Sequence, residues 1–219
     1  MEYRVTERIR KAAPEYKALI ITADVSNPPT ADALWAELTA CAQKVHDSYE
    51  MPWVNKRAAI AATRSAYKAC GKEPNRYRPS SEALMRRMVK GLELYRTLTV
   101  IDLINLLSVE CGHSIGGFDA DKIQGDSLTL GVGEEGEPYE AIGRGPLNIA
   151  GMPVWRDSVG GIGTPTSDNE RTKLSEDTKH ILMIVNMFGE EMPVDDIKAL
   201  TTRLLTDYAS ASNIQFTEV

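Results

Sequence analysis

The feature that most constrains the fold is an abrupt change in composition and residue pattern near residue 112. Twelve of the sixteen glycines in this 219-residue chain fall between Gly116 and Gly163. Short runs in the same stretch alternate apolar and polar residues, at Ser127–Val132, Tyr139–Ile142 and Pro153–Arg156. Glycine permits tight turns and close backbone approach, and such alternation is typical of half-buried strands. This half is therefore predicted to form small β-strands joined by tight turns.

The half before Gly112 shows helical spacing of its apolar residues instead. Helices are predicted from Thr30 or Asp32 to about Tyr49, over Asn55–Ala69, from Ser80 or Ser81 to Val89 or Lys90, and over Thr99–Cys111. Gly71 and Gly91 are natural C-terminal signals for two of them. The chain thus places most of its helices before its short strands.

The two ends of the chain add strands and one more helix. A short strand and a short helix precede a buried strand at Tyr16–Val25, and another buried strand is predicted over Thr178–Phe188. An amphipathic helix follows Pro193 over Val194–Ser212, and Asn213–Val219 is expected to add an edge strand. No repeat or linker interrupts the pattern. Residues 1–219 are therefore expected to form one α+β domain.

Several classes of protein are excluded by composition. A hydrophobic fraction of 42% is ordinary for a globular chain. Its best apolar run, Ile181–Phe188, is far shorter than the ~20 residues of a membrane helix, and the charged start MEYRVTERIRK lacks a signal-peptide core. The cysteines Cys41, Cys70 and Cys111 follow no metal-ligand spacing. We therefore expect a cytoplasmic protein with reduced thiols, no membrane partner, no cofactor and no metal.

Charge is distributed unevenly along the chain. Its formal net charge is −6, yet Lys56–Arg96 holds eleven basic residues against three acidic ones. That asymmetry predicts a basic face suited to phosphates. Its RNA-binding candidates are Arg64, Lys68, Arg76, Arg78, Arg86 and Arg87. The alternative is a solvated helix surface whose neighbours neutralise it.

Familiar catalytic templates do not occur. The chain has no Gly-x-Ser-x-Gly elbow, no phosphate loop and no His-Glu-x-x-His helix. Gly131–Gly136 fits the spacing Gly-x-Gly-x-x-Gly, but Glu-Pro-Tyr-Glu follows it rather than a helix, so we expect a hairpin turn there. The histidines His46, His113 and His180 are scattered and predict no site.

Two polar stretches are more distinctive. Ile115–Asp126 places paired glycines ahead of two carboxylates and a lysine. It is read either as a rigid turn holding polar groups inward or as a structural turn in which Asp119 or Asp121 caps backbone amides. Ser167–Lys179 alternates charges and hydroxyls, which can line a pocket beside a strand or cover an exposed loop.

At these residues the chain resembles a known family. The resemblance is carried by five segments, at Arg78–Leu84, Gly116–Asp119, Gly125-Asp126, Gly136–Pro138 and Glu170-Arg171-Thr172. Together they are similar to the tRNA-binding and editing module of the phenylalanyl-tRNA synthetase β subunit, in a small stand-alone form. The resemblance covers about residues 56–188. It implies a compact α+β fold, a β-sandwich-like core with helices outside, on which residues 1–55 and the helix 193–212 pack.

The resemblance also implies functions. The chain would bind tRNA or aminoacyl-tRNA, with hydrolysis of mischarged aminoacyl-tRNA in trans as an enzymatic option; it has no aminoacylation domain and should not charge tRNA. The alternative is a small-molecule, amino-acid-like binding protein that has kept the pocket only, which the pI of 5.2 and the 6% aromatic content favour. The oligomeric state is left open.

Site residues follow from the resemblance. Glu137 or Glu140 is expected to recognise a phenolic hydroxyl or orient water, and Thr172 joins them as a catalytic candidate. The substrate-binding candidates are Gly116, Gly117, Asp119, Lys122, Asp157, Gly160, Gly161, Asn169 and Arg171. Arg171 is an anion ligand in this reading; alternatively it pairs with Asp157 or Asp177. The chain departs from the family at Val154–Gly163, where Trp155 and Arg156 precede the Gly-Gly pair, so its substrate is expected to differ.

Overall fold

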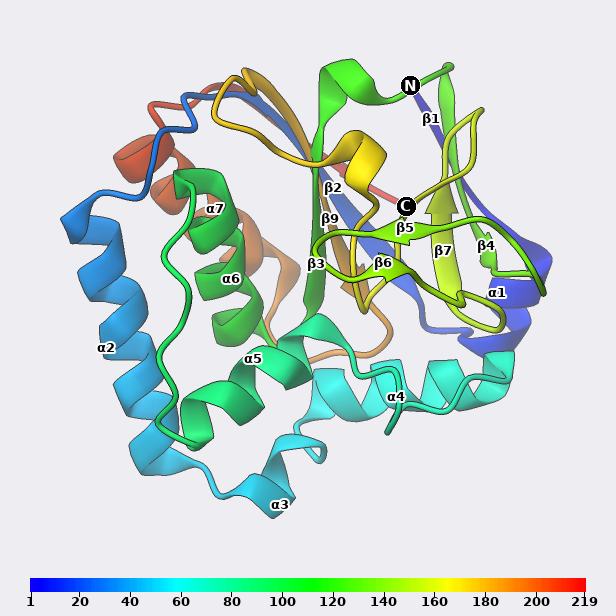
Figure 1. Ribbon diagram of the computed structural model, residues 1–219, viewed down its shortest axis with the longest axis horizontal. Helices are drawn as coiled ribbons and strands as arrows, with labels where there is room; N and C mark the ends of the chain where they lie inside the picture. Colours follow the sequence, from blue (N-terminus) through cyan, green and yellow to red (C-terminus); the bar gives the residue numbers. More distant parts are fainter.

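Two four-stranded β-sheets pack face to face in the computed structural model, which describes residues 1–219 (Figure 1). The first sheet has the order β1-β4-β7-β8. Its strands are β1 (Glu2–Val5), β4 (Ser127–Val132), β7 (Pro153–Arg156) and β8 (Gly161–Gly163). β1 runs parallel to β4, and the other neighbours are antiparallel.

The second sheet is antiparallel throughout, in the order β10-β2-β9-β3. Its strands are β10 (Ser212–Glu218), β2 (Lys17–Asp24), β9 (His180–Met187) and β3 (Ser114–Asp119). Leu19, Val185 and Ile115 lie side by side across β2, β9 and β3. A separate two-stranded ribbon joins β5 (Glu140–Ala141) to β6 (Gly145–Pro146).

β2 is apolar at nearly every position because both of its faces are covered. Successive side chains of a strand point to opposite faces. Leu19 and Ile21 pack into the core on the helical side, while Ala18 and Ile20 pack into the core between the two sheets. The uninterrupted apolar run in the sequence therefore marks the middle layer of three.

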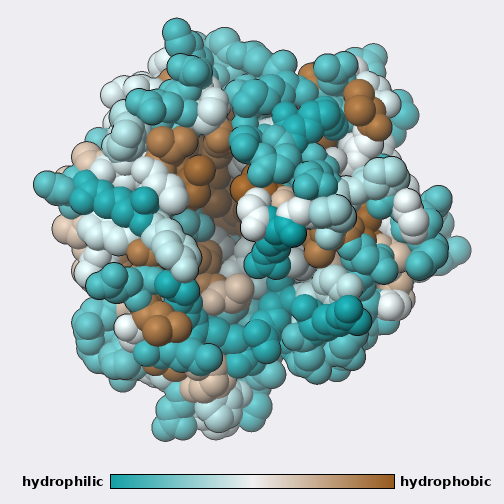
Figure 2. Space-filling model, viewed as in Figure 1, coloured by the Kyte–Doolittle hydropathy of each residue, from teal (hydrophilic) through white to brown (hydrophobic).

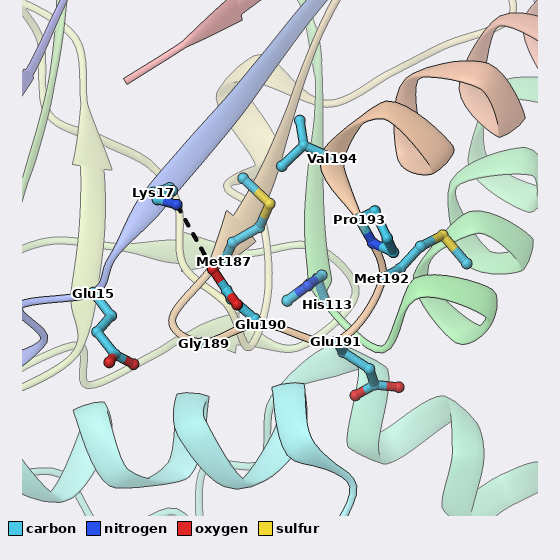
Figure 3. A pocket seen from close by; sticks show the side chains of 10 residues that line it. All are labelled: Glu15, Lys17, His113, Met187, Gly189, Glu190, Glu191, Met192, Pro193 and Val194. Atoms are coloured by element: carbon cyan, nitrogen blue, oxygen red, sulfur yellow. Dashed lines mark ion pairs between the residues drawn. The ribbon is translucent and has the colours of Figure 1, made fainter.

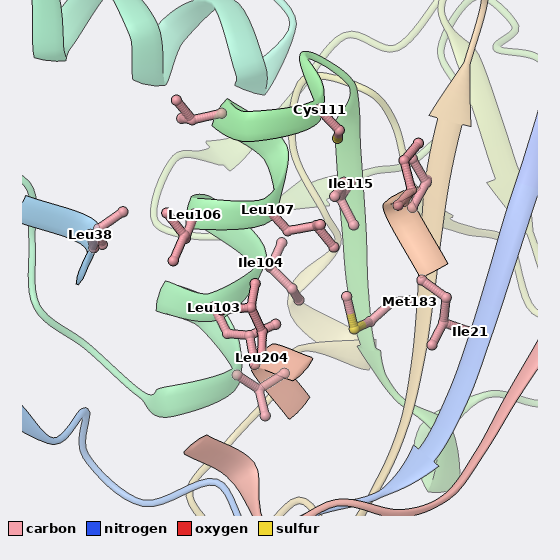
Figure 4. Close-up of a cluster of buried hydrophobic side chains, with 14 of the residues drawn as sticks. Ile21, Leu38, Leu103, Ile104, Leu106, Leu107, Cys111, Ile115, Met183 and Leu204 are labelled. Atoms are coloured by element: carbon pink, nitrogen blue, oxygen red, sulfur yellow. The ribbon is translucent and has the colours of Figure 1, made fainter. Parts of the chain in front are cut away.

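The helices are α1 (Glu7–Ala12), α2 (Asp32–Ser48), α3 (Met51–Val54), α4 (Ala58–Cys70), α5 (Ser80–Val89), α6 (Thr99–Cys111) and α7 (Val194–Ala209); two 3-10 turns, η1 (Ala120–Lys122) and η2 (Glu170–Thr172), lie in loops. α2, α5, α6 and α7 pack on the outer face of the second sheet, whereas α1 and the C-terminal half of α4 pack against the core between the two sheets. α6 is the central one: Leu103 and Leu107 lie in the cluster that also holds Leu38 of α2, Leu204 of α7 and Met183 of β9 (Figure 4).

Two of these helices end at glycines in the left-handed region. The φ angle is 95° at Gly71 after α4 and 80° at Gly112 after α6. A residue with a Cβ is strained at such angles, so glycine is favoured there. Gly112 turns the chain directly from α6 into β3, which brings this helix against the sheet.

Most of the predicted elements are confirmed. The α+β class with a sandwich-like core and helices outside is observed, the helix Thr99–Cys111 and the strands Ser127–Val132 and Pro153–Arg156 have the predicted bounds, and the C-terminal tail forms an edge strand on β2. No helix is long and apolar enough to cross a bilayer.

Two expectations were wrong. The helix predicted from Asn55 begins at Ala58, and the short helix α3, with a proline in its first turn, precedes it. The stretch after Ile115 is not a turn: Ser114–Asp119 is a fully buried strand, and only then does a 3-10 turn follow. Gly116 and Gly117 were misread as turn residues. Neither has a positive φ; each lies in a strand, where the missing side chain allows neighbouring side chains to pack closely.

Candidate functional site

A small pocket opens between the helices α5 and α6 on one side and β3 with the segment 168–174 on the other. Its volume is about 230 Å³. It is lined by Ser80, Leu84, Ile101, Ile104, Asn105, Ser108, Ile115, Gly117, Ile142, Asp168, Lys173 and Leu174. Figure 2 shows a hollow with brown, apolar side chains on this face of the molecule. The pocket therefore combines an apolar wall with a few polar groups, as ligand sites do.

Asp168 is the carboxylate of this pocket. Its Oδ2 accepts a hydrogen bond from the backbone N–H of Gly117 at 3.0 Å. One edge of the residue opens into the pocket while protein atoms surround the rest. Burial raises the pKa of Asp168 to about 7, and the single hydrogen bond from Gly117 offsets little of that rise. At neutral pH this group can therefore either accept or donate a proton.

The glycines around Asp168 are required by close contact. A Cβ on Gly116 would lie 2.6 Å from the Phe118 ring and 3.2 Å from the Asp168 carboxyl oxygen. A Cβ on Gly163 would lie 2.5 Å from the same ring and 3.0 Å from the same oxygen. A Cβ on Gly117 would lie 2.4 Å from Ile104 Cδ1. Side chains at these positions would push the carboxyl or α6 out of place. This is how the predicted Gly116 and Gly117 contribute to the site.

Two further polar side chains border the pocket. The Asn105 amide of α6 has no hydrogen-bond partner in the protein and is partly exposed, so it is available to a ligand. Lys173 forms an ion pair with Glu170 at 2.5 Å, so its ammonium is already engaged. No group of three or more His, Cys, Asp or Glu side chains is placed to hold a metal ion.

The three catalytic candidates from the sequence share no hydrogen bond with one another, although β5, which carries Glu140, lies against η2, which carries Thr172. Glu137 is held by Arg156 through two bonds of 2.6 Å and accepts the backbone N–H of Glu134. Burial raises the pKa of Glu137, but the Arg156 guanidinium outweighs it and holds that pKa below its ordinary value. Glu140 is exposed on β5, and the Thr172 hydroxyl is buried without a partner. None of the three lines the pocket.

Arg171 pairs with Asp157, which was one of the two alternatives for it. The two side chains form a forked pair with bonds of 2.8 and 2.9 Å. Asp157 also accepts the backbone N–H groups of Gln124, Val159 and Gly160. The candidate residues Asp157, Gly160 and Arg171 therefore meet, in an ion pair that ties together three loops.

The remaining substrate-binding candidates are also used internally. Asp119 accepts from the Asp121 N–H and the Thr178 hydroxyl, and its carboxylate lies 3.1 Å from Lys122 Nζ. That confirms the capping alternative for Asp119. Asn169 caps η2 through the N–H of Arg171. A Cβ on Gly161 would lie 2.8 Å from the Tyr139 ring, so this glycine permits close packing.

The basic segment is only partly free. Glu82 is fully buried on α5 and accepts from Arg64 of α4 and Arg86 of α5, each at 2.8 Å. Two of the predicted RNA-binding residues therefore neutralise a buried carboxylate. Arg87 lies over the Tyr95 ring at 4.5 Å. Lys68, Arg76 and Arg78 are exposed and have no carboxylate partner.

Sequence reasoning named the segment that holds Asp168 but not Asp168 itself. Of the two alternatives for Ser167–Lys179, the first holds at three positions, since Asp168, Lys173 and Leu174 line this pocket. Asn105 and Ile104 were missed because they stand in an ordinary helical pattern. Only their position against β3 gives them a role.

Comparison with known proteins gives a family match. The family model described as B3/4 domain matches residues 62–204. Among solved structures, an N-terminal fragment of the phenylalanyl-tRNA synthetase β-subunit from Pyrococcus horikoshii aligns with a TM-score of 0.49 and 12% identity, over 100% of this chain and 54% of that chain. The chain thus spans about half the length of that fragment. No curated protein sequence matches.

Proposed function

The chain belongs to the B3/4 domain family, a domain found in phenylalanyl-tRNA synthetase β subunits, and from this premise we propose that its pocket binds the aminoacyl group of an aminoacyl-tRNA. The observation that carries the proposal is Asp168, a carboxyl that opens into a pocket with a largely apolar wall. The α-amino group of an aminoacyl ester is a hydrogen-bond donor that such a carboxyl recognises. The proposal includes a cytoplasmic protein in which residues 1–219 act as one unit.

The dimensions suit an amino-acid side chain. A dry protein cavity of about 150 Å³ can hold a benzene ring. The 230 Å³ pocket has room for a side chain of that size beside Leu84, Ile101 and Leu174, with its amino group near Asp168. The Asn105 amide offers a further hydrogen bond for the ester carbonyl.

The tRNA part rests on the exposed cations next to the pocket. Arg78 lies two residues before Ser80, which lines the pocket, and Arg76 lies two residues before Arg78. At ~3.5 Å per residue, the loop from Arg76 to Ser80 reaches no more than ~14 Å. A polynucleotide whose end enters the pocket would thus have its phosphates within reach of these guanidinium groups.

Hydrolysis of the aminoacyl ester is a second candidate function, favoured by the raised pKa of Asp168. A general base works best when its pKa lies near the working pH, and the pKa of Asp168 is about 7. The carboxylate would take a proton from a water whose oxygen attacks the ester carbonyl, and would return that proton to the ribose oxygen as the bond between this oxygen and the carbonyl carbon breaks. Glu140, which is exposed on β5 outside the pocket, remains a candidate for contacting the rest of the tRNA, whereas Thr172 is fully buried and can only help to position its neighbours.

The test compares binding and deacylation with matched variants. Tyrosyl-tRNA(Phe), phenylalanyl-tRNA(Phe), uncharged tRNA(Phe) and the two free amino acids are offered to wild type, Asp168→Asn and Asp177→Asn; Asp177 is an exposed carboxylate of the same segment without a partner. We expect charged tRNA to bind at least ten-fold tighter than uncharged tRNA, and Asp168→Asn alone to abolish that difference.

Each other outcome contradicts a defined part. Equal affinity for charged and uncharged tRNA would overturn aminoacyl recognition. Binding of free amino acid without tRNA binding would replace the proposal by the small-molecule alternative. Release of amino acid at the spontaneous rate by the wild type would overturn hydrolysis and leave binding intact. The double variant Arg76→Glu, Arg78→Glu tests the role of these two cations in tRNA binding. An unchanged affinity for tRNA would show that they do not contribute to it.

A further inference from the structure

His113 is a buried histidine whose ring has no hydrogen-bond partner. It follows Gly112 between α6 and β3, is 1% exposed, and its Nδ1 is enclosed. The Ser108 hydroxyl donates to its backbone carbonyl at 2.6 Å, which holds the main chain in place. Buried polar atoms are rarely left without partners, and those that are call for an explanation.

Its ring faces a second cavity, separate from the pocket of Asp168. This cavity measures about 640 Å³ and lies where the chain leaves β9 for α7. Its lining is Glu15, Lys17, His113, Met187, Gly189, Glu190, Glu191, Met192, Pro193 and Val194. Figure 3 shows His113 in the middle, with Met187 and Glu190 to one side and Pro193 and Met192 to the other.

The charged and the apolar side chains of this cavity differ in how exposed they are. Glu15 and Glu190 are exposed at its rim, where Lys17 approaches Glu190 only to 3.9 Å. Met187, Pro193 and Val194 give the apolar part. Glu191 is engaged elsewhere, by Arg57 and the backbone N–H of Ala59. The rim thus carries two carboxylates and one ammonium, while the Met187 side chain and the His113 imidazole are buried.

The ring is neutral at physiological pH. Burial lowers the pKa of His113 to about 4, and the Arg57 guanidinium acts in the same direction. A neutral imidazole has one N–H donor and one acceptor nitrogen. Nδ1 is enclosed, so a ligand reaches the ring at Nε2, and a hydroxyl suits that nitrogen in either tautomer because it both donates and accepts.

From this arrangement we propose that the cavity is a second ligand site, for a small organic amine whose apolar body carries a hydroxyl at its far end. The ammonium lies at the Glu15 and Glu190 rim, the body against Met187 and Val194, and the hydroxyl bonds the His113 ring. Its volume is within the ~300–1,000 Å³ range of small-molecule sites. The two rim carboxylates outnumber the Lys17 ammonium, so an anionic ligand is disfavoured.

Three probes of one length test this in the wild-type protein: 6-amino-1-hexanol, hexylamine and 6-hydroxyhexanoate. Binding is followed in protein labelled with ¹³C at the methionine methyl groups, with the Met187 signal assigned through Met187→Leu. We expect saturable shifts of Met187 with 6-amino-1-hexanol, an affinity for hexylamine about five- to ten-fold lower, and no shift with the carboxylate. Equal affinity for all three, or no Met187 shift with any, would overturn the proposal.

Two variants sharpen the result. His113→Phe should bring the affinity for 6-amino-1-hexanol down to that for hexylamine, while Asp168→Asn should leave both affinities unchanged. Loss of probe binding in Asp168→Asn would place the amine in the first pocket instead and overturn the second site. Because the probe series needs no variant, the proposal stays testable even if His113→Phe unfolds, and it stands or falls independently of the aminoacyl proposal.

Discussion

The Asp168 carboxylate accepts a hydrogen bond from the backbone N–H of Gly117 at 3.0 Å, 51 residues away in the sequence. This contact joins the loop after β8 to the middle of β3 and places a carboxyl in a pocket with a largely apolar wall. A side chain on Gly116 or Gly163 would crowd that carboxyl. The glycines Gly116 and Gly117 of β3 and the segment that carries Asp168 are thus two parts of one site.

The first prediction concerns pH and Asp168. Its pKa rises from 3.8 in the unfolded chain to about 7 in the folded protein, so the folded state holds a proton that the unfolded state releases. The associated stability is complete below about pH 3.8 and is lost as the pH rises through 7. The wild-type protein should therefore lose on the order of 4 kcal/mol of its free energy of unfolding between pH 4 and pH 8, and Asp168→Asn should lack this decline. Urea unfolding at pH 4, 5.5 and 8 measures it, and identical pH profiles for wild type and variant would contradict it.

The second prediction concerns the buried carboxylate of α5. Glu82→Gln leaves the guanidinium groups of Arg64 and Arg86 without the negatively charged carboxylate that accepts hydrogen bonds from both. Breaking a buried ion pair costs about 3–5 kcal/mol. We expect a loss of that order in the free energy of unfolding from urea denaturation. Glu93→Gln, at an exposed position of the following loop, is the control and should change it by less than about 0.5 kcal/mol.

The third prediction concerns Asp157, whose side chain is fully buried against Arg171. Burial raises its pKa, but the Arg171 guanidinium and the N–H groups of Gln124, Val159 and Gly160 outweigh that and hold it below the ordinary 3.8. This stability is present above pH 3.8 and is lost as the pH falls through the lower pKa.

Asp157→Asn should therefore cost about 2–4 kcal/mol at pH 7, with the gap to wild type narrowing in acid. Thermal unfolding between pH 2 and pH 7 measures it. Asp126→Asn, an exposed carboxylate near the same loop, serves as the control. A gap that stays constant over this pH range would show that charge plays no part.

The fourth prediction concerns the contact between the two sheets. Asn186 of β9 accepts hydrogen bonds from the Tyr16 hydroxyl at 2.9 Å and from Trp155 Nε1 at 3.1 Å. Asn186→Leu leaves two buried donors unpaired, each at a cost of about 1–3 kcal/mol. We expect a loss of about 3 kcal/mol in the free energy of unfolding. Tyr16→Phe removes one donor together with its bond and should cost about half as much; a smaller effect of Asn186→Leu than of Tyr16→Phe would refute the account.

Local pattern was sufficient for most of the elements. The helix Thr99–Cys111 and the strand Ser127–Val132 were predicted to the residue, because helical and alternating periodicities were both clear there. The buried strands β2 and β9 were also recognisable, because a strand covered on both faces shows a continuous apolar run. Gly116 and Gly117 misled the prediction, since the sequence does not show whether a glycine serves a turn or a close approach.

Charge and polarity along the sequence located segments but not partners. The basic segment Lys56–Arg96 was evident, yet only packing decides that Arg64 and Arg86 neutralise Glu82 while Arg76 and Arg78 stay exposed. In the same way, folding brings Arg171 to Asp157 and leaves Asp168 facing the pocket with one hydrogen bond. The sequence by itself determined the layers, because periodicity reports burial over a few residues. The tertiary structure decided which polar groups are engaged and which remain free for a ligand, because those contacts join residues far apart in the chain.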